Sequence, residues 1–307
     1  MTTQTAGTAV SVRPLDATAT VFIVAICAVW GFNQVAVKLA LPDIPPLTQA
    51  LIRSIGGTVI IGIVARLRGV DFSLRDGTLA AGLFAGALFG LEFILIYRGL
   101  LYTTASRATL FINLAPIIVV LGMRWITPGD RFGVMQWTGV ALAFLGIVIA
   151  FGVPVPSADP RQMFGDTMMI VAAFGWAATT LAIKATNLNH ARFEKTFLYQ
   201  LVVSIPIFTF GVWAFGERMA PNPSALAIIS VTYQTLFVVG VTFLAWFALI
   251  QRFSASRLSV FTFLTPLFGV LFGHFVLGEP LTLPFGIAVI CVIAGLVLVN
   301  RPAKGTR

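Results

Sequence analysis

Apolar runs of about 20 residues alternate with short polar or proline-rich stretches along most of the chain. A membrane-spanning helix needs about 20 mostly apolar residues, so each run predicts one span. Breaking the chain at charged residues, proline and glycine predicts ten spans, at residues 20–40, 47–66, 78–98, 104–126, 133–152, 166–184, 195–215, 225–250, 255–277 and 283–300. The first run has no convincing cleavage site, and we interpret it as a retained span rather than a signal peptide.

The composition agrees with a membrane protein. Hydrophobic residues make up 58% of the chain and charged residues only 10%, whereas a soluble domain carries about 25% charged residues. We therefore expect an integral membrane protein whose surroundings are the lipid bilayer. The 20 Lys and Arg outnumber the 11 Asp and Glu, but they lie mainly at the ends of apolar runs. That placement indicates membrane orientation rather than nucleic-acid binding.

Three chemistries lack a signature in the sequence. There is no phosphate-binding loop of the Walker type, so ATP is not expected as the energy source. The two cysteines, Cys27 and Cys291, each lie in an apolar run and indicate neither a metal site nor a disulfide framework. No nucleophile elbow is present. We expect no metal and no cofactor.

The chain contains an internal repeat. ASRATLFINLAP at 105–116 returns as ASRLSVFTFLTP at 255–266, with six of twelve positions identical. Trp30 to Lys38 corresponds to Trp176 to Lys184, and Gly129-Asp130 corresponds to Gly278-Glu279. The predicted organisation is a cytoplasmic tail, a first repeat, a linker, a second repeat and a second cytoplasmic tail, at residues 1–19, 20–152, 153–165, 166–300 and 301–307.

Each predicted repeat has five spans. Because five is odd, the two repeats must enter the membrane from opposite sides. The predicted fold is therefore an all-α integral membrane protein with ten transmembrane helices in two inverted five-helix repeats. In carriers with inverted repeats the substrate site lies between the halves near the bilayer midplane. With the amino terminus inside, 14 Lys and Arg lie on the inner side. Six lie on the outer side, namely Lys38, Arg53, Arg98, Arg107, Arg161 and Arg218. This imbalance predicts that both termini are cytoplasmic.

Several of these motifs together resemble a known family. Trp30-Gly-Phe-Asn33 followed by Lys38, Ala-Ser-Arg leading to a mid-helix proline, and Gly278-Glu279 before the last span resemble EamA-type members of the drug/metabolite transporter superfamily. The resemblance covers nearly the whole chain. Within the family, the chain is most similar to the bacterial aromatic amino-acid exporter branch. The first repeat departs from the family pattern with Asp130 where Glu is common. The resemblance implies a ten-helix carrier of a bacterial-type inner membrane that exports small metabolites or amino acids.

Polar and aromatic residues at predicted membrane depth are the candidates for substrate binding. Trp30 and Asn33 share one helix face in span one, and the second repeat has a similar set in span six. They either line a central cavity or hold helices together by hydrogen bonds. We favour the cavity, because inversion places both sets near one midplane. The counterparts in span six are Trp176, Thr179 and Thr180. The remaining candidates are Tyr97, Asn113, Tyr199 and Trp246.

Glu92 is the one carboxylate deep inside a predicted span. An ionisable residue at that depth is costly, by about 2.5–3.5 kcal/mol on insertion scales, and it usually faces water or a partner. Two interpretations stay open. Glu92 binds a proton or a substrate ammonium group, or it forms a structural pair with Arg53 or Arg98. Protons are accordingly a candidate coupling ion.

Four residues are candidates for gating. Pro116 and Pro266 remove a backbone hydrogen bond in mid-helix. They would either let each repeat bend or have a static role in the shape of the helix. Lys38 and Lys184 occupy matched positions late in their helices, where they extend to the membrane surface, gate the pathway or pair with an anion.

These observations predict a secondary transporter that exports small metabolites by alternating access. Amino acids with apolar or aromatic side chains are the preferred substrates, because a mostly apolar pocket with a few polar groups suits them. The alternative is an exporter of hydrophobic organic cations or drugs. A channel would not need inverted repeats with matched tryptophans, and the spans offer no clear catalytic pair for an enzyme. We expect spans one, three, four and six to nine around the cavity, and spans five and ten at the periphery.

Overall fold

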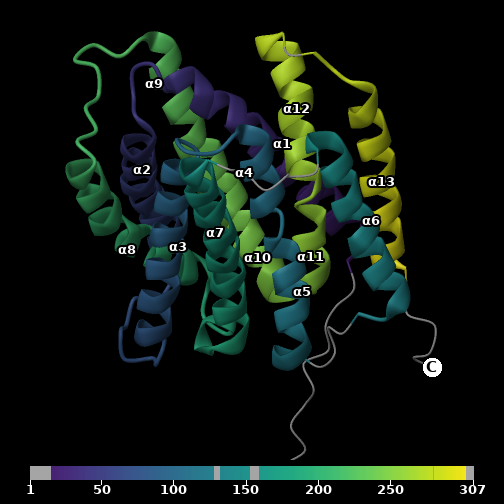
Figure 1. The fold of residues 1–307 in the computed structure, drawn as a ribbon. Helices are drawn as coiled ribbons and strands as arrows, with labels where there is room; N and C mark the ends of the chain where they lie inside the picture. The colour runs from purple at the N-terminus through teal and green to yellow at the C-terminus, as the bar shows by residue number, and fades with distance from the viewer. Residues whose placement is uncertain (1–14, 128–131, 153–158, 279, 302–307) are drawn as a thin grey trace, which may run out of the picture.

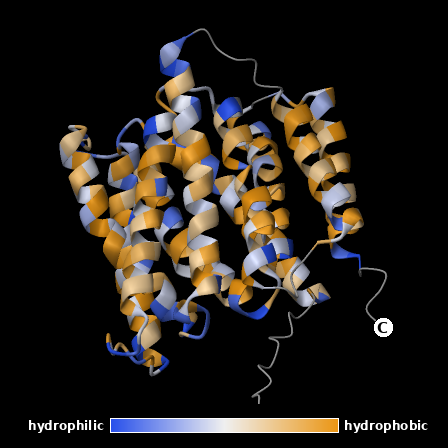
Figure 2. Cartoon of the chain, turned by 60° about the horizontal axis from the view of Figure 1, so that its bottom comes forward, coloured by the Kyte–Doolittle hydropathy of each residue, from blue (hydrophilic) through white to orange (hydrophobic). Residues whose placement is uncertain are grey.

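The fold is described from a computed structural model that covers residues 15–127, 132–152, 159–278 and 280–301 (Figure 1). Within these ranges the chain is helical, and ten helical segments are long and apolar enough to cross a membrane. The predicted fold class and the number of spans are confirmed. Large apolar side chains on the outside of the bundle, such as Phe84 and Ile290, are more than half exposed. Hydrophobic residues also run along the length of the helices (Figure 2), as a protein surrounded by lipid requires.

The first repeat consists of α1 (Ala17–Ala40), α2 (Pro46–Leu67), α3 (Leu79–Gly99), α4 (Ala105–Ile112), α5 (Ala115–Ile126) and α6 (Val134–Phe151). The second repeat consists of α7 (Pro160–Ala185), α8 (Phe193–Ala214), α9 (Ala225–Tyr233), α10 (Leu244–Arg252), α11 (Ala255–Phe261), α12 (Leu264–Leu277) and α13 (Leu283–Asn300). A 3₁₀ turn, η2 (Asn187–Asn189), precedes α8, and a π-helical segment, η3 (Gln234–Phe243), joins α9 to α10.

Helix α7 begins at Pro160, six residues before the start predicted for span six and inside the stretch predicted as a linker. The local signals explain this start. The carboxylate of Asp159 accepts the backbone N–H of Arg161 at 2.9 Å and so caps the helix. Proline is favoured in the first helical turn, because its missing N–H has no intrahelical partner there. The polar first turn had obscured a helix that continues outward beyond the apolar run.

Spans four and nine are each divided into two helices at equivalent places. Helix α4 ends at Ile112 and α5 begins at Ala115, directly before Pro116. Likewise α11 ends at Phe261 and α12 begins at Leu264, two residues before Pro266. Each proline lacks the N–H that would continue the preceding helix, so the hydrogen-bond ladder is interrupted there. The predicted kinks thus coincide with two-residue interruptions of the helix, and both repeats have one at the equivalent place.

Span eight contains the π-helical segment η3 in its middle. A π-helix is rare, because its i→i+5 hydrogen bonds widen the helix, and it is found mostly as a single turn at functional sites. Here it extends for ten residues between α9 and α10. The apolar run predicts an unbroken span at 225–250, and no sequence signal indicates the π-helix.

Helices pack mainly across the two repeats. Helix α3 packs on α7 and α8, α2 packs on α8, and α1 packs on α12. Helices α6 and α13 form a tight pair at one edge of the bundle (Figure 1). Their backbones nearly touch, since a Cβ on Gly295 would lie 2.5 Å from the carbonyl oxygen of Gly139. The remaining helices surround a space between the repeats.

Candidate functional site

A cavity of about 400 Å³ lies between the repeats. This volume falls within the roughly 300–1,000 Å³ typical of small-molecule sites. Side chains from α1, α2, α3, α4, α7, α8, η3, α10 and α12 line the cavity. Its lining includes Lys38 and the exposed Leu41 and Leu100, at the ends of α1 and α3 predicted to lie on the outer side. The cavity therefore opens toward the predicted outer face.

Aromatic rings form the floor of the cavity. Trp30 of α1 is at the centre of this floor, with ring centroids 5.1 Å from Phe243, 5.3 Å from Trp246 and 6.2 Å from Trp176. Its indole N–H donates to the hydroxyl of Thr242 at 2.9 Å. The two tryptophans that the repeat alignment matched, Trp30 and Trp176, thus meet edge to face.

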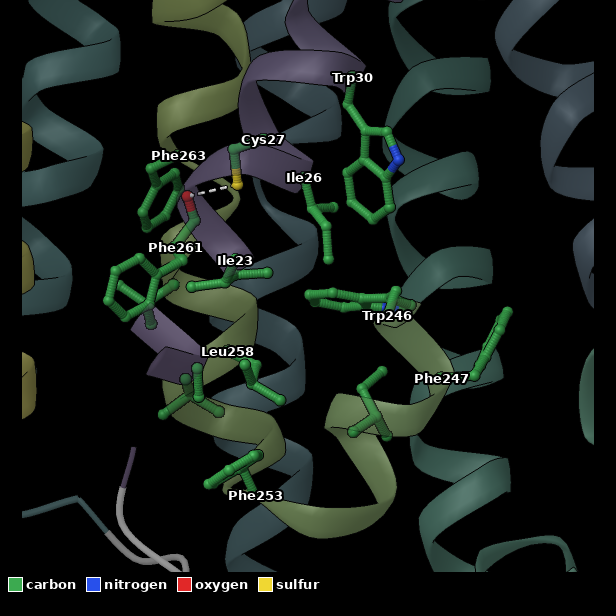
Figure 3. Close-up of a cluster of buried hydrophobic side chains, with 14 of the residues drawn as sticks. Ile23, Ile26, Cys27, Trp30, Trp246, Phe247, Phe253, Leu258, Phe261 and Phe263 are labelled. Carbon is green, nitrogen blue, oxygen red and sulfur yellow. Dashed lines mark hydrogen bonds between the residues drawn. The ribbon is translucent and has the colours of Figure 1, made fainter. Parts of the chain in front are cut away.

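A buried apolar cluster continues from this floor toward the predicted inner face (Figure 3). It includes Ile23, Ile26 and Leu258, each at most 3% exposed. The thiol of Cys27 donates to the carbonyl oxygen of Phe261 at 3.3 Å and links α1 to the end of α11. Closely packed apolar side chains leave no path for a polar solute, so the cavity is closed on this side.

A few polar groups interrupt the apolar lining. Asn33 of α1 lines the cavity, and its Oδ1 atom is buried with no hydrogen-bond partner in the described structure. Thr179 and Thr180 of α7 line it as well, and the hydroxyl of Thr179 donates to the carbonyl of Gly175 at 3.0 Å. An amide oxygen without a partner beside a cavity is available to accept a hydrogen bond from a bound molecule.

Glu92 lines the cavity and is only 5% exposed. It packs beside Gly175 of α7, where a built Cβ would lie 3.3 Å from the Cβ of Glu92. No other described residue forms an ion pair or a hydrogen bond with its carboxylate. Arg98, one of its two predicted partners, stacks over the ring of Phe215 at 3.8 Å instead.

Arg53, the other predicted partner, also lines the cavity without pairing with Glu92. It is 5% exposed, and its Nη1 donates to the hydroxyl of Tyr97 at 3.1 Å. The sequence predicts Arg53 as a charge on the outer side and does not predict span two at the cavity. The available signal was its depth, since it lies seven residues after Pro46, well inside α2.

Other predicted site residues lie outside the cavity lining. Tyr199 of α8 covers Gly82, and its hydroxyl shares a 3.0 Å hydrogen bond with that of Thr78. The side-chain amide of Asn113 donates to the carbonyl of Thr109 at 2.7 Å, beside the break between α4 and α5. The candidate gating residues Lys184, Pro116 and Pro266 are also outside the lining, whereas Lys38 belongs to it. Phe89, Phe93, Gln34 and Gln200 line the cavity and were not among the predicted residues.

Polar contacts fix α2 against α8 at both membrane faces. On the predicted inner side, Lys195 in the first turn of α8 donates to the Asp76 carboxylate at 2.6 Å. That contact, with the Thr78 hydroxyl next, lowers the pKa of Asp76 to about 2. On the other side, the Glu217 carboxylate accepts the N–H groups of Leu47 and Thr48 at the start of α2, at 3.1 and 2.8 Å. The contacts follow the inverted repeat, since in each case the loop after one helix holds the first turn of the other.

An ion pair joins the repeats beside the cavity. The guanidinium of Arg107, in α4, donates to the carboxylate of Asp166, in α7. The neighbouring residues Ala108 and Met169 line the cavity. Both charged side chains are at most 16% exposed. This pair thus holds α4 against α7 on the predicted outer side.

Comparison with known proteins identifies a family. The profile of the EamA-like transporter family matches residues 17–152 and again residues 163–301, once in each repeat. The uncharacterised transporter YvbV of Bacillus subtilis is 26% identical, over 96% of this chain and 96% of its own length. YoaV of the same organism is 22% identical, over 89% and 94% of the two chains.

A further relative and a solved structure agree. The uncharacterised inner membrane transporter YedA of Escherichia coli is 22% identical, over 90% of this chain and 88% of its own. A protein of known crystal structure superposes with a TM-score of 0.77 at 20% identity, covering 92% of this chain and 97% of that one. That similarity shows the same ten-span fold.

Proposed function

Because this chain belongs to the EamA-like transporter family, of the drug/metabolite transporter superfamily, we propose that it exports amino acids with apolar or aromatic side chains. The family makes it a multi-pass membrane transporter of small molecules rather than an enzyme. The observation that carries the substrate class is Glu92, a buried carboxylate that lines an aromatic cavity and pairs with no other described residue. A substrate with an ammonium group would supply the missing positive charge.

The cavity walls suit the rest of such a substrate. Most lining side chains are apolar, with a few polar groups, which is the usual composition of a small-molecule site. Trp30, Trp246 and Phe93 offer ring faces and edges to an aromatic or aliphatic side chain. The amide of Asn33 and the hydroxyl of Thr180 add hydrogen-bonding groups at the same depth. This combination of lining groups supports a substrate like that of the aromatic amino-acid exporter branch.

Alternating access follows from the inverted repeats. The cavity opens toward the predicted outer face and is closed inward by the aromatic floor. Exchanging the conformations of the two repeats would open it inward, which is how carriers of this type operate. The matched breaks at Pro116 and Pro266 are the proposed hinges. Lys38 and Lys184, at opposite ends of the pathway, are the proposed gates. The proposed location is a bacterial-type inner membrane with both termini cytoplasmic.

Hydrophobic organic cations are the second candidate substrates. Glu92 and the surrounding rings would bind such a cation by charge and by cation–π attraction, without a carboxylate on the substrate. Amino acids remain the first candidate because the cavity lining contains a buried positive charge at Arg53 as well as Glu92.

The test is counterflow in proteoliposomes loaded with each amino acid in turn and, separately, with a lipophilic cation. We expect exchange of phenylalanine, tryptophan or leucine. Glu92→Gln should raise the half-saturating concentration about tenfold to a hundredfold, because a hydrogen bond to a charged group contributes about 1.5–3 kcal/mol. Trp30→Ala should weaken exchange of aromatic substrates most.

The matched control is Asp71→Asn, which neutralises an exposed carboxylate far from the cavity and should leave exchange unchanged. Exchange of a lipophilic cation without exchange of any amino acid would replace the leading substrate class by the second. If Glu92→Gln alters neither affinity nor the pH dependence of transport, Glu92 is neither the ammonium site nor the proton site.

A further inference from the structure

We propose that Arg53 and Tyr97 form a carboxylate-binding subsite in the cavity, so that the transported molecule is a zwitterion held by both ends. The inference rests on the proposed function, in which Glu92 binds the ammonium end. It adds a second charged contact, which sequence analysis did not assign, and it separates amino acids from amines that lack a carboxylate.

The environment of Arg53 lacks an anion. The side chain is 5% exposed and belongs to the cavity lining. Its Nη1 reaches the Tyr97 hydroxyl at 3.1 Å, and its guanidinium carbon lies 5.7 Å from the centre of the Phe93 ring. Its Nε is buried and makes no hydrogen bond in the described structure. No described carboxylate forms an ion pair with it.

Burying such a guanidinium costs free energy unless an anion pairs with it. Charged groups within membrane spans almost always pair with one another, with backbone carbonyls or with water. One neutral hydroxyl and one ring face do not balance a buried positive charge. Glu92 lines the same cavity but does not pair with Arg53. The missing partner is therefore an anion that enters the cavity, and a carboxylate matches the forked donors of arginine best.

Tyr97 completes the subsite. Its hydroxyl oxygen accepts the hydrogen bond from Arg53, which leaves its proton free to donate to a second oxygen. A carboxylate next to both groups would therefore receive hydrogen bonds from the guanidinium and from the phenol. The position of α2 is fixed beside them, because Ser54 shares a 2.8 Å hydrogen bond with Ser204 of α8. A preorganised subsite of this kind loses little entropy when a ligand binds.

The two subsites face one cavity. Glu92 and Tyr97 both line it from α3, five residues apart, and Arg53 reaches Tyr97 from α2. Each residue of an α-helix rises 1.5 Å, so the backbones of Glu92 and Tyr97 differ by about 7.5 Å in depth. A ligand with an ammonium group and a carboxylate therefore has a partner for each charge in the same cavity. A molecule that carries only one of the two charges leaves the other charge of the site unpaired and should bind more weakly.

The experiment compares three probes that share a phenyl ring. Phenylalanine carries both charges, 2-phenylethylamine carries the ammonium alone, and 3-phenylpropionate carries the carboxylate alone. Binding is measured as thermal stabilisation of the purified full-length chain in detergent, and transport as counterflow in proteoliposomes. The variants are Arg53→Gln, Arg53→Lys and Tyr97→Phe. Arg66→Gln, an exposed arginine on the same helix, is the matched control.

We expect Arg53→Gln to raise the half-saturating concentration of phenylalanine at least tenfold and to abolish stabilisation by 3-phenylpropionate. Stabilisation by 2-phenylethylamine should stay the same or increase, because a repelling charge is removed. Tyr97→Phe should weaken phenylalanine binding less than Arg53→Gln does. Arg53→Lys, which keeps the charge without the fork, should give an intermediate affinity. Arg66→Gln should leave binding of all three probes unchanged.

Equal loss of the zwitterion and the amine in Arg53→Gln would overturn the proposal, because it would show a structural role. If Arg53→Gln does not fold, the same comparison is made with Arg53→Lys and Tyr97→Phe, and equal effects on both probes again refute it. Stabilisation of the wild type by the amine alone would refute the carboxylate subsite and leave a cation transporter. Arg53-dependent binding of 3-phenylpropionate without amino-acid exchange would refute the proposed function and leave the subsite standing.

Discussion

The contact between α1 and α12 at Gly31 positions the cavity floor, and Gly31→Ala tests this. A Cβ on Gly31 would lie 2.5 Å from the Cβ of Phe268, 2.8 Å from the amide nitrogen of Gly269 and 2.9 Å from the carbonyl carbon of Phe268. Carbon atoms in ordinary contact are about 3.5–4.0 Å apart. Backbone atoms cannot rotate away, so α1 must move from α12 by roughly 1 Å at this point.

The cost of this shift can be estimated. Overpacking by one methyl group in a close-packed interior costs about 1–3 kcal/mol. Trp30 directly precedes Gly31 and moves with the helix, so its 2.9 Å hydrogen bond to Thr242 should lengthen. We expect the apparent melting temperature in detergent to fall by several degrees. We also expect the half-saturating concentration for phenylalanine counterflow to rise, because the floor of the cavity is displaced.

Gly269→Ala is the matched control for the same helix crossing. A Cβ there would meet only Gln34 Cγ and the Gly31 carbonyl oxygen, both at 3.6 Å, which is ordinary contact. This variant should melt and transport like the wild type, apart from a small gain in helix propensity. The reasoning fails if Gly31→Ala matches the wild type in both assays, or if the two variants are equally impaired.

Three further predictions concern single contacts. Thr242→Val removes the acceptor of the Trp30 indole N–H and should destabilise the protein by about 1–3 kcal/mol. Adding Trp30→Phe should restore part of this loss, because the double variant has no indole N–H left without an acceptor. Strictly additive effects of the two substitutions would contradict the bond. The lowered pKa of Asp76 means that its contact with Lys195 stabilises the fold above its ordinary pKa of 3.8 and that this contribution is lost as the pH falls toward 2. Asp76→Asn should therefore flatten the melting temperature between pH 5 and pH 2, and an unchanged slope would show that other groups dominate. A cysteine at Asn222, in the loop after α8, should react with an impermeant maleimide in intact cells, whereas reaction only after permeabilisation would reverse the predicted orientation.

The number of spans and their duplication could be predicted from the sequence, because both depend on local properties. A run of about 20 apolar residues is long enough to cross the bilayer whatever packs against it. The repeated phrase ending in Pro116 and Pro266 identified two equivalent segments, and both turn out to be broken at the same place. Inversion follows from the odd number of spans in each repeat. The matched tryptophans, Trp30 and Trp176, could likewise be expected near one midplane, where the structure brings them into contact.

The surroundings of the charged and polar side chains were decided only by tertiary packing. In a bilayer the lipid-facing and the core-facing sides of a helix are both apolar, so the periodicity of apolar residues does not say which side faces inward. The sequence therefore predicts Arg53 as a charge on the outer side, whereas in the structure it contacts Tyr97 and Phe93 of α3 beside the cavity. Tyr97 and Tyr199 looked equivalent in the sequence, yet one lines the cavity and the other covers Gly82. Burial and pairing depend on which helix faces meet, and that is settled by the fit of side chains across the two repeats.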